Sequence, residues 1–554
     1  MAEPASAAAP RRLVVVGGGP KALFALEALA SRLDPAHRPS LHVTVLDPHE
    51  RPGPGGAYAP DQPDSVRLNV DAAILDAPAS GAAGSFAAWV RAHRPELAED
   101  AYPPRAVVGE YLLERWEHCR ERWRDIGPLV HRRGTAVGAR RDGEGWRVQV
   151  LAPGAAHPEE LPCDELLLAT GHAGTHRGAL AAAWEGPEPL VPAVHPVETM
   201  LDPASVPPGA RVAVRGAALT FLDAALVLTE GRGGRFDADP RSGALVHRRG
   251  ADEPATILPT ARHGLLLHPK PAPGTSLPRD ARAAIDEGRR RLAQARPGAA
   301  AASVPQVIGI VEDTAAALLG GAASAREDVV RTLATGREPD LAEGPGSAER
   351  ALRRAVDVAA GTGVPGPAWA LGRAWSGLYP QITRALRGSD APGPVWQELR
   401  DAAQVLERFA FGPPLVTARK LLAMLDSGAV DLSWLEAGTR IGPRRITGVP
   451  SGAAAADVVV DAVLAPPGVR RLHDPLLQQL RADGHLHVRP GRRGAVVDLD
   501  GTALDTAGRR VDGLVLVGRP TEDHVIGHDT LNRHLHDEID HWAQRLAGKV
   551  REHA

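Results

Sequence analysis

The opening of the chain alternates between two hydrophobic periods. Residues 13–16 form a short, β-branched, uniformly apolar run, which is typical of a strand buried on both faces of a parallel sheet. Apolar side chains then recur at intervals of three and four over residues 21–33, behind Pro20, and residues 41–46 form another strand-like run. The first 47 residues therefore predict a strand–helix–strand unit.

Later segments repeat this alternation with one interruption. Period-two segments at 134–141 and 146–151, followed by 165–169, predict a β-meander. A second strand–helix pair is predicted at 211–216 and 219–230, where the sequence GRGG then breaks the helix.

The second half of the chain changes character. An Ala-, Leu- and Arg-rich stretch with helical spacing, from about 278 to 435, predicts an all-helical insertion. Strands are predicted again afterwards and should rejoin the first sheet, with a closing helix at 530–546; they cover residues 457–463, 495–499 and 514–517.

Composition narrows the possible functions. The chain has 554 residues, 44% apolar and 24% charged, with a formal charge of -3, so it lacks the basic excess that nucleic-acid binding usually requires. No window reaches the roughly 18 apolar residues of a membrane span. The two cysteines, Cys119 and Cys163, lie far apart, which fits a reducing cytoplasm and excludes a CxxC redox centre. We expect a cytoplasmic protein whose ligands bind in pockets.

The turn after the first strand carries the strongest chemical signal. LVVVGGGPKA (residues 13–22) places Gly17, Gly19 and Ala22 in the GxGxxG/A pattern between a predicted strand and a predicted helix. The first glycine permits the tight turn, the second lets the backbone approach a pyrophosphate, and the third position allows close packing of helix and strand. The spacing predicts a dinucleotide site.

Two further segments support this site. Asp47 ends the second predicted strand thirty residues after Gly17, where a carboxylate can accept both ribose hydroxyls of an adenosine, although a turn-forming Asp before Pro48 is the simpler alternative. ELLLATGH (residues 165–172) is an apolar strand that ends in small residues, which lets the backbone pass close to a cofactor.

Together these motifs resemble the bacterial FAD-NAD(P)-binding family of flavin monooxygenase-like proteins. The resemblance is carried by GGGPKA (17–22), GPGGAYAPDQPDSVRLNV (53–70), LLLATGH (166–172), RVAVRGAALTFLDAALVLTEGRGG (211–234), AFGPPLV (410–416) and GRPTEDHVIGHDTLNRHLH (518–536). It implies FAD on the first unit, NAD(P)H on the second, and these flavin-site candidates: Arg67, Asn69, Thr170, Gly171, Gly518 and Asp529.

The second unit departs from this pattern. Gly216 matches the first glycine, but Ala218 stands at the second and adds a methyl group where the pyrophosphate should approach. Thirty residues beyond Gly216 the chain offers Arg248 and Arg249 rather than a carboxylate, which favours the 2′-phosphate of NADPH. The NADPH candidates are Gly216, Thr220, Arg248 and Arg249.

Other charged clusters are weaker candidates. Arg262 and Lys270 follow the second unit and are the substrate-binding candidates, for either an anionic substrate or the nicotinamide phosphates. His534, Glu538 and His541 share one face of the predicted last helix, but an apolar stripe explains that helix without a metal, and we expect none. The hydrolase, P-loop and zincin motifs GxSxG, GxxxxGK[ST] and HExxH do not occur.

We predict an α/β fold with two dinucleotide-binding, Rossmann-like domains, a β-meander and a large all-α insertion. The division is a disordered tail at 1–12, an FAD domain at 13–205 and 440–554, an NAD(P)H domain at 206–277, and a helical substrate or cap region at 278–439. The resemblance implies an NADPH-consuming monooxygenase that transfers oxygen from a flavin hydroperoxide to a small molecule. It extends to enzymes that N-oxygenate aspartate. An NAD(P)H oxidoreductase without oxygen transfer and a non-catalytic dinucleotide-binding protein remain alternatives.

Overall fold

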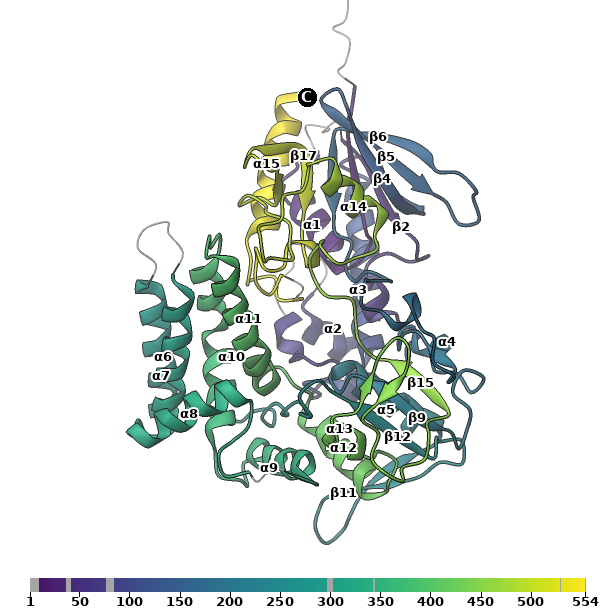
Figure 1. The fold of residues 1–554 in the computed structure, drawn as a ribbon. Coiled ribbons are helices and arrows are strands. Elements are labelled where there is room, and N and C mark those ends of the chain that lie inside the picture. The colour runs from purple at the N-terminus through teal and green to yellow at the C-terminus, as the bar shows by residue number, and fades with distance from the viewer. Residues whose placement is uncertain are drawn as a thin grey trace, which may run out of the picture. The chain divides into compact units, whose positions relative to one another are not determined.

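The structure is a computed structural model that describes residues 9–35, 41–75, 84–295, 302–341, 344–528 and 530–553. The chain divides into two compact units (Figure 1). The first contains Met1–Asp61, Ala72–Arg177 and Ala465–Ala554, and the second contains Gln62–Asp71 and Gly178–Leu464. Both units are therefore built from segments that are distant in sequence.

A six-stranded sheet organises the first unit. Its order is β16-β17-β7-β1-β2-β3, and all neighbours are parallel except the β16–β17 pair. In the central strands, residues 13–16 of β1 and all of β7 are buried, as the apolar runs predict. The strands are β1 (Arg11–Val16), β2 (Leu41–Asp47), β3 (Leu129–Arg133), β7 (Glu165–Leu168), β16 (Thr502–Leu504) and β17 (Arg510–Leu516).

Helices and a meander surround this sheet. The helix α1 leaves β1 and lies beside α15 from the far end of the chain (Figure 1). The three-stranded antiparallel meander is β4 (Thr135–Asp142), β5 (Gly145–Leu151) and β6 (Glu159–Cys163). The helices are α1 (Pro20–Ala30), α2 (Phe86–His93), α3 (Arg105–Trp123), α14 (Pro475–Ala482) and α15 (Glu538–His553).

A smaller parallel sheet organises the second unit, in the order β12-β9-β15-β8. The helix α5 (Leu219–Leu228) follows β9, and two hairpins flank the sheet. The sheet strands are β8 (Leu190–Val191), β9 (Arg211–Arg215), β12 (Thr256–Thr260) and β15 (Val458–Asp461). The hairpin strands are β10 (Arg235–Ala238), β11 (Leu245–Arg248), β13 (Arg440–Ile441) and β14 (Ile446–Thr447).

The predicted helical region is helical, and part of it shares a core with the second sheet. Buried side chains of α9 and α12 pack in one cluster with those of β9 and α5, so these helices are not a separate domain. The remaining helices of the second unit are α4 (Val197–Met200), α6 (Arg279–Gln294), α7 (Val304–Leu318), α8 (Ala323–Thr335), α9 (Ser347–Ala360), α10 (Pro367–Leu386), α11 (Gly393–Ala410), α12 (Leu415–Asp426) and α13 (Ser433–Glu436).

Several predicted elements differ from the structure. The strand predicted at 457–463 does not rejoin the first sheet, because β15 pairs with β9. The segment 165–169 is not the third meander strand, because β7 lies between β1 and β17. Residues 495–499 contribute only one isolated bridge, at Val497. Arg11 and Arg12, predicted as tail, already belong to β1, while residues 1–8 lie outside the described part.

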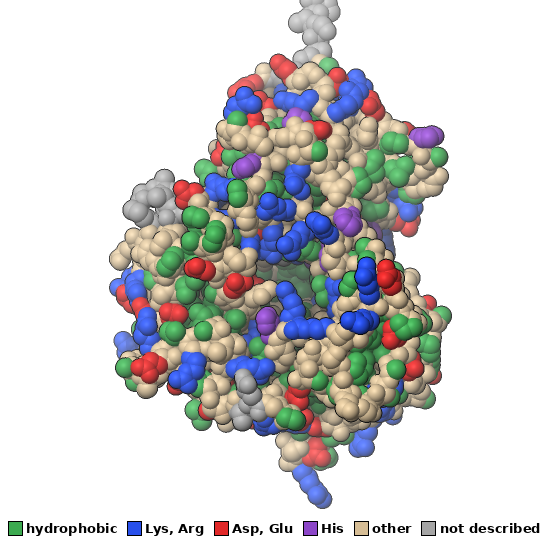
Figure 2. All heavy atoms as spheres, viewed as in Figure 1, with side chains coloured by type: hydrophobic (Ala, Val, Ile, Leu, Met, Phe, Trp, Pro, Cys, Tyr) green, Lys and Arg blue, Asp and Glu red, His purple; other side chains and the backbone are tan. Residues whose placement is uncertain are grey.

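The surface carries charges of both signs. Lys and Arg side chains occur at many places on the face drawn in Figure 2, with Asp and Glu side chains between them. Among the described residues, no helix is both long and apolar enough to cross a membrane.

Candidate functional site

The turn between β1 and α1 has a conformation that requires glycine. Gly17 has a φ of 97°, and a Cβ placed there would lie 2.3 Å from the backbone oxygen of Ala169, at the end of β7. Its N–H donates to the carbonyl oxygen of Leu46 at 2.8 Å. The turn thus passes directly over the carboxyl ends of β7 and β2, where parallel sheets bind their ligands.

The second glycine of this turn faces open space. Gly19 is the N-cap of α1 with an extended backbone (φ −79°) that other residues can adopt, and no side chain caps the helix. A Cβ on Gly19 would meet only the Cα of Gly55, at 3.8 Å. Gly55, at φ 61°, comes from the loop that Gly53 anchors by donating to the Gly18 carbonyl oxygen at 2.6 Å. Two glycines therefore line a cradle that side chains would fill, which fits an approaching pyrophosphate.

Asp47 supports this turn directly. Its buried carboxylate accepts the N–H of Gly18 at 2.5 Å and both the N–H and the Nδ1 of His49, at 2.8 and 2.7 Å. Burial opposes ionisation, but these hydrogen bonds prevail and lower the pKa of Asp47, while the pKa of His49 is raised by the carboxylate. Asp47 therefore first holds the phosphate turn in place, and its contact with a ribose stays a prediction.

Other predicted flavin residues lie at the same edge of the sheet. Thr170 and Gly171 follow β7, and Gly518 follows β17, the next strand along. Gly518 has a φ of 80°, and a Cβ there would lie 3.5 Å from Cγ of Lys21 at the start of α1. Ala22, completely buried, lets α1 pack closely on the sheet. The structure thus brings Gly17, Gly19, Ala22, Asp47, Thr170, Gly171 and Gly518 together within the first unit.

Three predicted flavin residues belong to the second unit or lie outside the described residues. Arg67 and Asn69 belong to Gln62–Asp71 of the second unit, where neighbouring Val66 packs in the core, so their flavin role stays a prediction. Asp529 lies outside the described residues.

A buried histidine network beside Gly518 was not anticipated from the sequence. Nδ1 of His528 accepts the N–H of Gly518 at 3.1 Å and lies 2.5 Å from Oγ1 of Thr521. Nε2 of His528 lies 3.7 Å from a carboxylate oxygen of Glu538, and all three side chains are buried. Because Nδ1 accepts a backbone N–H, the proton of a neutral His528 belongs on Nε2, facing Glu538.

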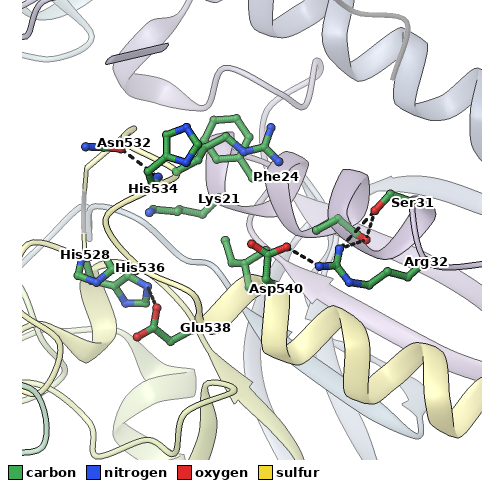
Figure 3. Close-up of a pocket in the computed structure, with 13 residues that line it drawn as sticks. Lys21, Phe24, Ser31, Arg32, His528, Asn532, His534, His536, Glu538 and Asp540 are labelled. Carbon is green, nitrogen blue, oxygen red and sulfur yellow. Dashed lines mark hydrogen bonds and ion pairs between the residues drawn. The ribbon is translucent and has the colours of Figure 1, made fainter. Parts of the chain in front are cut away.

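His528 and Glu538 border a pocket of about 650 Å³ along one side of α1 (Figure 3). His528, His536 and Glu538 lie at one end of it, and the Arg32–Asp540 pair, 2.7 Å apart, lies at the other (Figure 3). The predicted face of His534, Glu538 and His541 does not form, because α15 begins only at Glu538.

A buried ion network ties the C-terminal segment to α1 next to this pocket. Glu27 of α1 accepts hydrogen bonds from Arg115 of α3, at 2.8 Å from Nε, and from Arg533, at 2.9 Å. The Arg115 side chain is only 2% exposed, and both guanidinium groups lie against the ring of Phe24. The segment that carries Gly518 and His528 is thus fixed to the helix that follows the glycine turn.

The second turn has the same first glycine but carries Ala218 in place of the second one. Gly216, at φ 112°, donates its N–H to the carbonyl oxygen of Thr260 at 3.0 Å, and Thr220 is buried in α5. Ala218 is the N-cap of α5 with an extended backbone (φ −100°), as Gly19 is for α1, and its methyl group is exposed. A ligand that approaches this turn would therefore meet the Ala218 methyl group before the backbone.

The 2′-phosphate role predicted for Arg248 and Arg249 does not fit their positions. Arg248 is exposed on the β10–β11 hairpin, which is not part of the second sheet. Arg249 donates to the carbonyl oxygen of Ala255 at 3.0 Å, immediately before β12 begins, and contacts Glu253. That is the amino edge of the parallel sheet, opposite to the edge where Gly216 lies.

The two predicted substrate residues, Lys270 and Arg262, have different surroundings. Lys270 donates its N–H to the Pro413 carbonyl oxygen at 2.9 Å and its ammonium to that of Gly412, and burial lowers its pKa to about 8. It thus lies against the FGPP segment of the helical region. Arg262 is exposed just after the carboxyl end of β12.

Comparisons with known proteins agree with this geometry. Residues 14–173 match the family described as FAD-NAD(P)-binding. The L-aspartate N-monooxygenases (nitrosuccinate-forming) of Streptomyces cremeus and Streptomyces davaonensis are each 28% identical, over 47% and 40% of this chain and 43% and 39% of their own length. The matched regions therefore span less than half of each relative.

The fold has a solved counterpart. The ornithine N-hydroxylase of Kutzneria sp. 744, solved with reduced FAD, NADP+ and L-ornithine, aligns with a TM-score of 0.50 at 13% identity, covering 98% of this chain and 99% of that one. This likeness concerns the fold alone. The match to the FAD-NAD(P)-binding family covers the Gly17 turn, Asp47 and Thr170, which all lie within residues 14–173.

Proposed function

We propose that this chain is an FAD-dependent monooxygenase that consumes NADPH and dioxygen and oxygenates the amine nitrogen of a small amino acid such as aspartate. The proposal assigns FAD to the first unit and NADPH to the β9–α5 turn, so that the chain contains two dinucleotide-binding domains and a helical region on the substrate side. The observation that carries it is the Gly17 turn, whose glycine cradle, formed by Gly19 and Gly55, fits a dinucleotide. The names of the matched relatives support the reaction class.

The residues of the first unit would bind and orient the cofactor. A bound FAD supplies a hydride acceptor and a centre that activates dioxygen. Gly19 and the N-terminus of α1 would hold its phosphates, and Asp47 keeps that turn in position. Thr170, Gly171 and Gly518 would lie along it at the sheet edge, with the Gly518 N–H oriented by His528.

The substrate imposes two requirements on the rest of the chain. An amine must be unprotonated to take up oxygen, and the carboxylates of an amino acid need cationic or N–H partners. Lys270 is the proposed carboxylate partner, because its ammonium is held against Gly412 by only one of its three N–H donors. Water must also be kept away from the reacting centre, which a helical region over the substrate would achieve.

Three measurements on the purified full chain test the proposal. The protein should show the absorption bands of bound flavin, NADPH should bleach these bands without oxygen, and aspartate with NADPH and oxygen-18 should give a labelled hydroxylamino product or nitrite. A colourless protein that does not bind added FAD would refute the proposal. Flavin bleaching without labelled product from any amino acid would instead support an NADPH oxidoreductase.

A further inference from the structure

The two sheets share a local arrangement at their glycine turns that defines equivalent positions. In the first unit Val16 pairs with Leu46, and Gly17 donates to the Leu46 carbonyl oxygen at 2.8 Å. In the second unit Arg215 pairs with Thr260, and Gly216 donates to the Thr260 carbonyl oxygen at 3.0 Å. The residue after the accepting carbonyl therefore has the same place in both units.

The side chain at this position differs between the two units. In the first unit it holds Asp47, whose carboxylate lies against the glycine turn. In the second unit it holds Ala261, which has no polar side chain. A carboxylate at the end of this neighbouring strand accepts the ribose hydroxyls of a dinucleotide and repels a 2′-phosphate, so its replacement by alanine removes the feature that selects an unphosphorylated ribose.

Guanidinium groups converge on the same strand end. Arg440 donates to the backbone oxygen of Arg262 at 2.7 Å, and Arg337 donates to that of His263 at 3.3 Å. Arg262 itself is exposed, and within the described ranges no hydrogen bond or ion pair engages its guanidinium. Two arginines from distant segments therefore hold the strand end, while a third remains available for a ligand.

We propose that Arg262, with Arg440 beside it, binds the 2′-phosphate of NADPH and makes the second unit select the phosphorylated dinucleotide. The inference rests on the proposed function, because it assumes that a nicotinamide dinucleotide binds at the Gly216 turn. A planar guanidinium offers paired N–H donors that match phosphate oxygens. Arg262 is thereby assigned to the coenzyme instead of the substrate. It takes the 2′-phosphate role that the sequence predicted for Arg248 and Arg249.

The strand length explains why the hairpin arginines cannot substitute. Arg249 is bound to Ala255, just before the first residue of β12, whereas Arg262 follows the last residue, Thr260. A five-residue strand rises about 16 Å at roughly 3.3 Å per residue. The Arg249 anchor is therefore separated from the Gly216 turn by the full length of the sheet.

Direct binding of 2′,5′-ADP and 5′-AMP, measured by calorimetry on the full-length flavin-loaded protein, tests the inference without turnover. The wild type should bind 2′,5′-ADP more tightly. Arg262→Ala should reduce this preference about 10- to 100-fold, the range for losing a hydrogen bond to a charged group. Arg248→Ala, which removes another exposed arginine, on the hairpin, is the control and should leave the preference unchanged. Ala261→Asp installs the missing carboxylate and should shift flavin reduction from NADPH towards NADH.

The outcomes separate the inference from the proposed function. The inference is wrong if the wild type does not distinguish the two nucleotides, or if Arg248→Ala lowers the preference and Arg262→Ala does not. In either case, reduction of the flavin by NADPH or NADH would still support the proposed function. If neither NADPH nor NADH reduces the flavin, the proposed function fails. Should Arg262→Ala not fold, the coenzyme preference of Ala261→Asp decides, and an unchanged preference there overturns the inference.

Discussion

Substitution of Gly17 by alanine is the most direct test of the first glycine turn. The added methyl group meets two obstacles. At φ 97° an alanine is strained by about 1–3 kcal/mol. Its Cβ would also lie 2.3 Å from the Ala169 oxygen, so the backbone of β1 or β7 must shift, at a further cost of about 1–3 kcal/mol.

The two costs together are about 2–6 kcal/mol, a large share of the roughly 5–15 kcal/mol that stabilises a domain. We expect Gly17→Ala to lower the melting temperature of the first unit by about 5–20 °C, at about 2–4 °C per kcal/mol. The variant should also be purified without flavin absorption. Differential scanning calorimetry and the flavin spectrum measure the two effects on the same sample.

Gly548→Ala provides the matched control, because it makes the same chemical change in α15 of the same unit. A Cβ there meets no atom within 4 Å, and alanine is favoured over glycine in a helix by about 0.5–1 kcal/mol. It should unfold slightly later than the wild type and keep its flavin. If Gly17→Ala behaved like Gly548→Ala, the close approach of the turn to β7 would not be required, and the reasoning about this site would be refuted.

Three further predictions concern charged and thiol groups. Glu27→Gln removes the charge that two guanidinium groups share and should lower the free energy of unfolding by about 3–5 kcal/mol, measured by thermal unfolding. Glu117→Gln, in the exposed pair with Arg120, should lower it by less than about 1 kcal/mol. Equal losses would contradict the buried network. Burial lowers the pKa of Lys270 to about 8, so its ammonium loses its proton above that pH. KM for a carboxylate substrate should therefore rise above pH 8 in the wild type but not in Lys270→Arg. Parallel pH profiles of KM in the two proteins would exclude this role of Lys270. Burial raises the pKa of both Cys119 and Cys163 to about 12, so a thiol reagent at pH 8 should label neither until denaturant is added, and rapid labelling of the native protein would disprove their burial.

The first dinucleotide unit could be predicted from sequence because its signals are local. A glycine turn needs only its neighbouring strand and helix to be recognised, and residues 13–47 contain all three. The tertiary partners of the turn were not readable. Ala169 and Gly55 reach Gly17 and Gly19 only after the sheet has formed, and nothing in their own sequence marks that contact.

The second unit shows where counting residues fails. A distance of thirty residues from Gly216 reaches the β10–β11 hairpin, because this hairpin is inserted between α5 and β12. The strand beside β9 thus begins only at Thr256, and the position that we propose for coenzyme selection moves from Arg248 to Ala261 and Arg262. A short apolar run also cannot reveal which sheet it joins, which is why β15 was expected in the wrong unit.

The C-terminal segment shows the same limit for helices. Leu531 and Leu535 continue the apolar spacing of α15 towards the N-terminus, and both are buried, but the helix begins only at Glu538. Their burial comes from the packing of an irregular segment, in which His528 contacts Thr521 and Glu538. The spacing of apolar residues predicts which side chains are buried, but whether the backbone between them is helical depends on its hydrogen bonds.

The two units therefore share one backbone arrangement at their glycine turns. Both turns place a glycine at positive φ, donate its N–H to the neighbouring strand, and begin a helix behind an extended N-cap. The backbone alone cannot distinguish one nucleotide from another, because it presents the same N–H groups in both places. Under the proposed function, selection comes from the first side chain after each neighbouring strand's accepting carbonyl, which is Asp47 in one unit and Ala261, followed by Arg262, in the other. Ala261→Asp should therefore change the coenzyme preference while leaving the Gly216 turn intact, whereas replacement of Asp47 would also remove the carboxylate that accepts the Gly18 N–H.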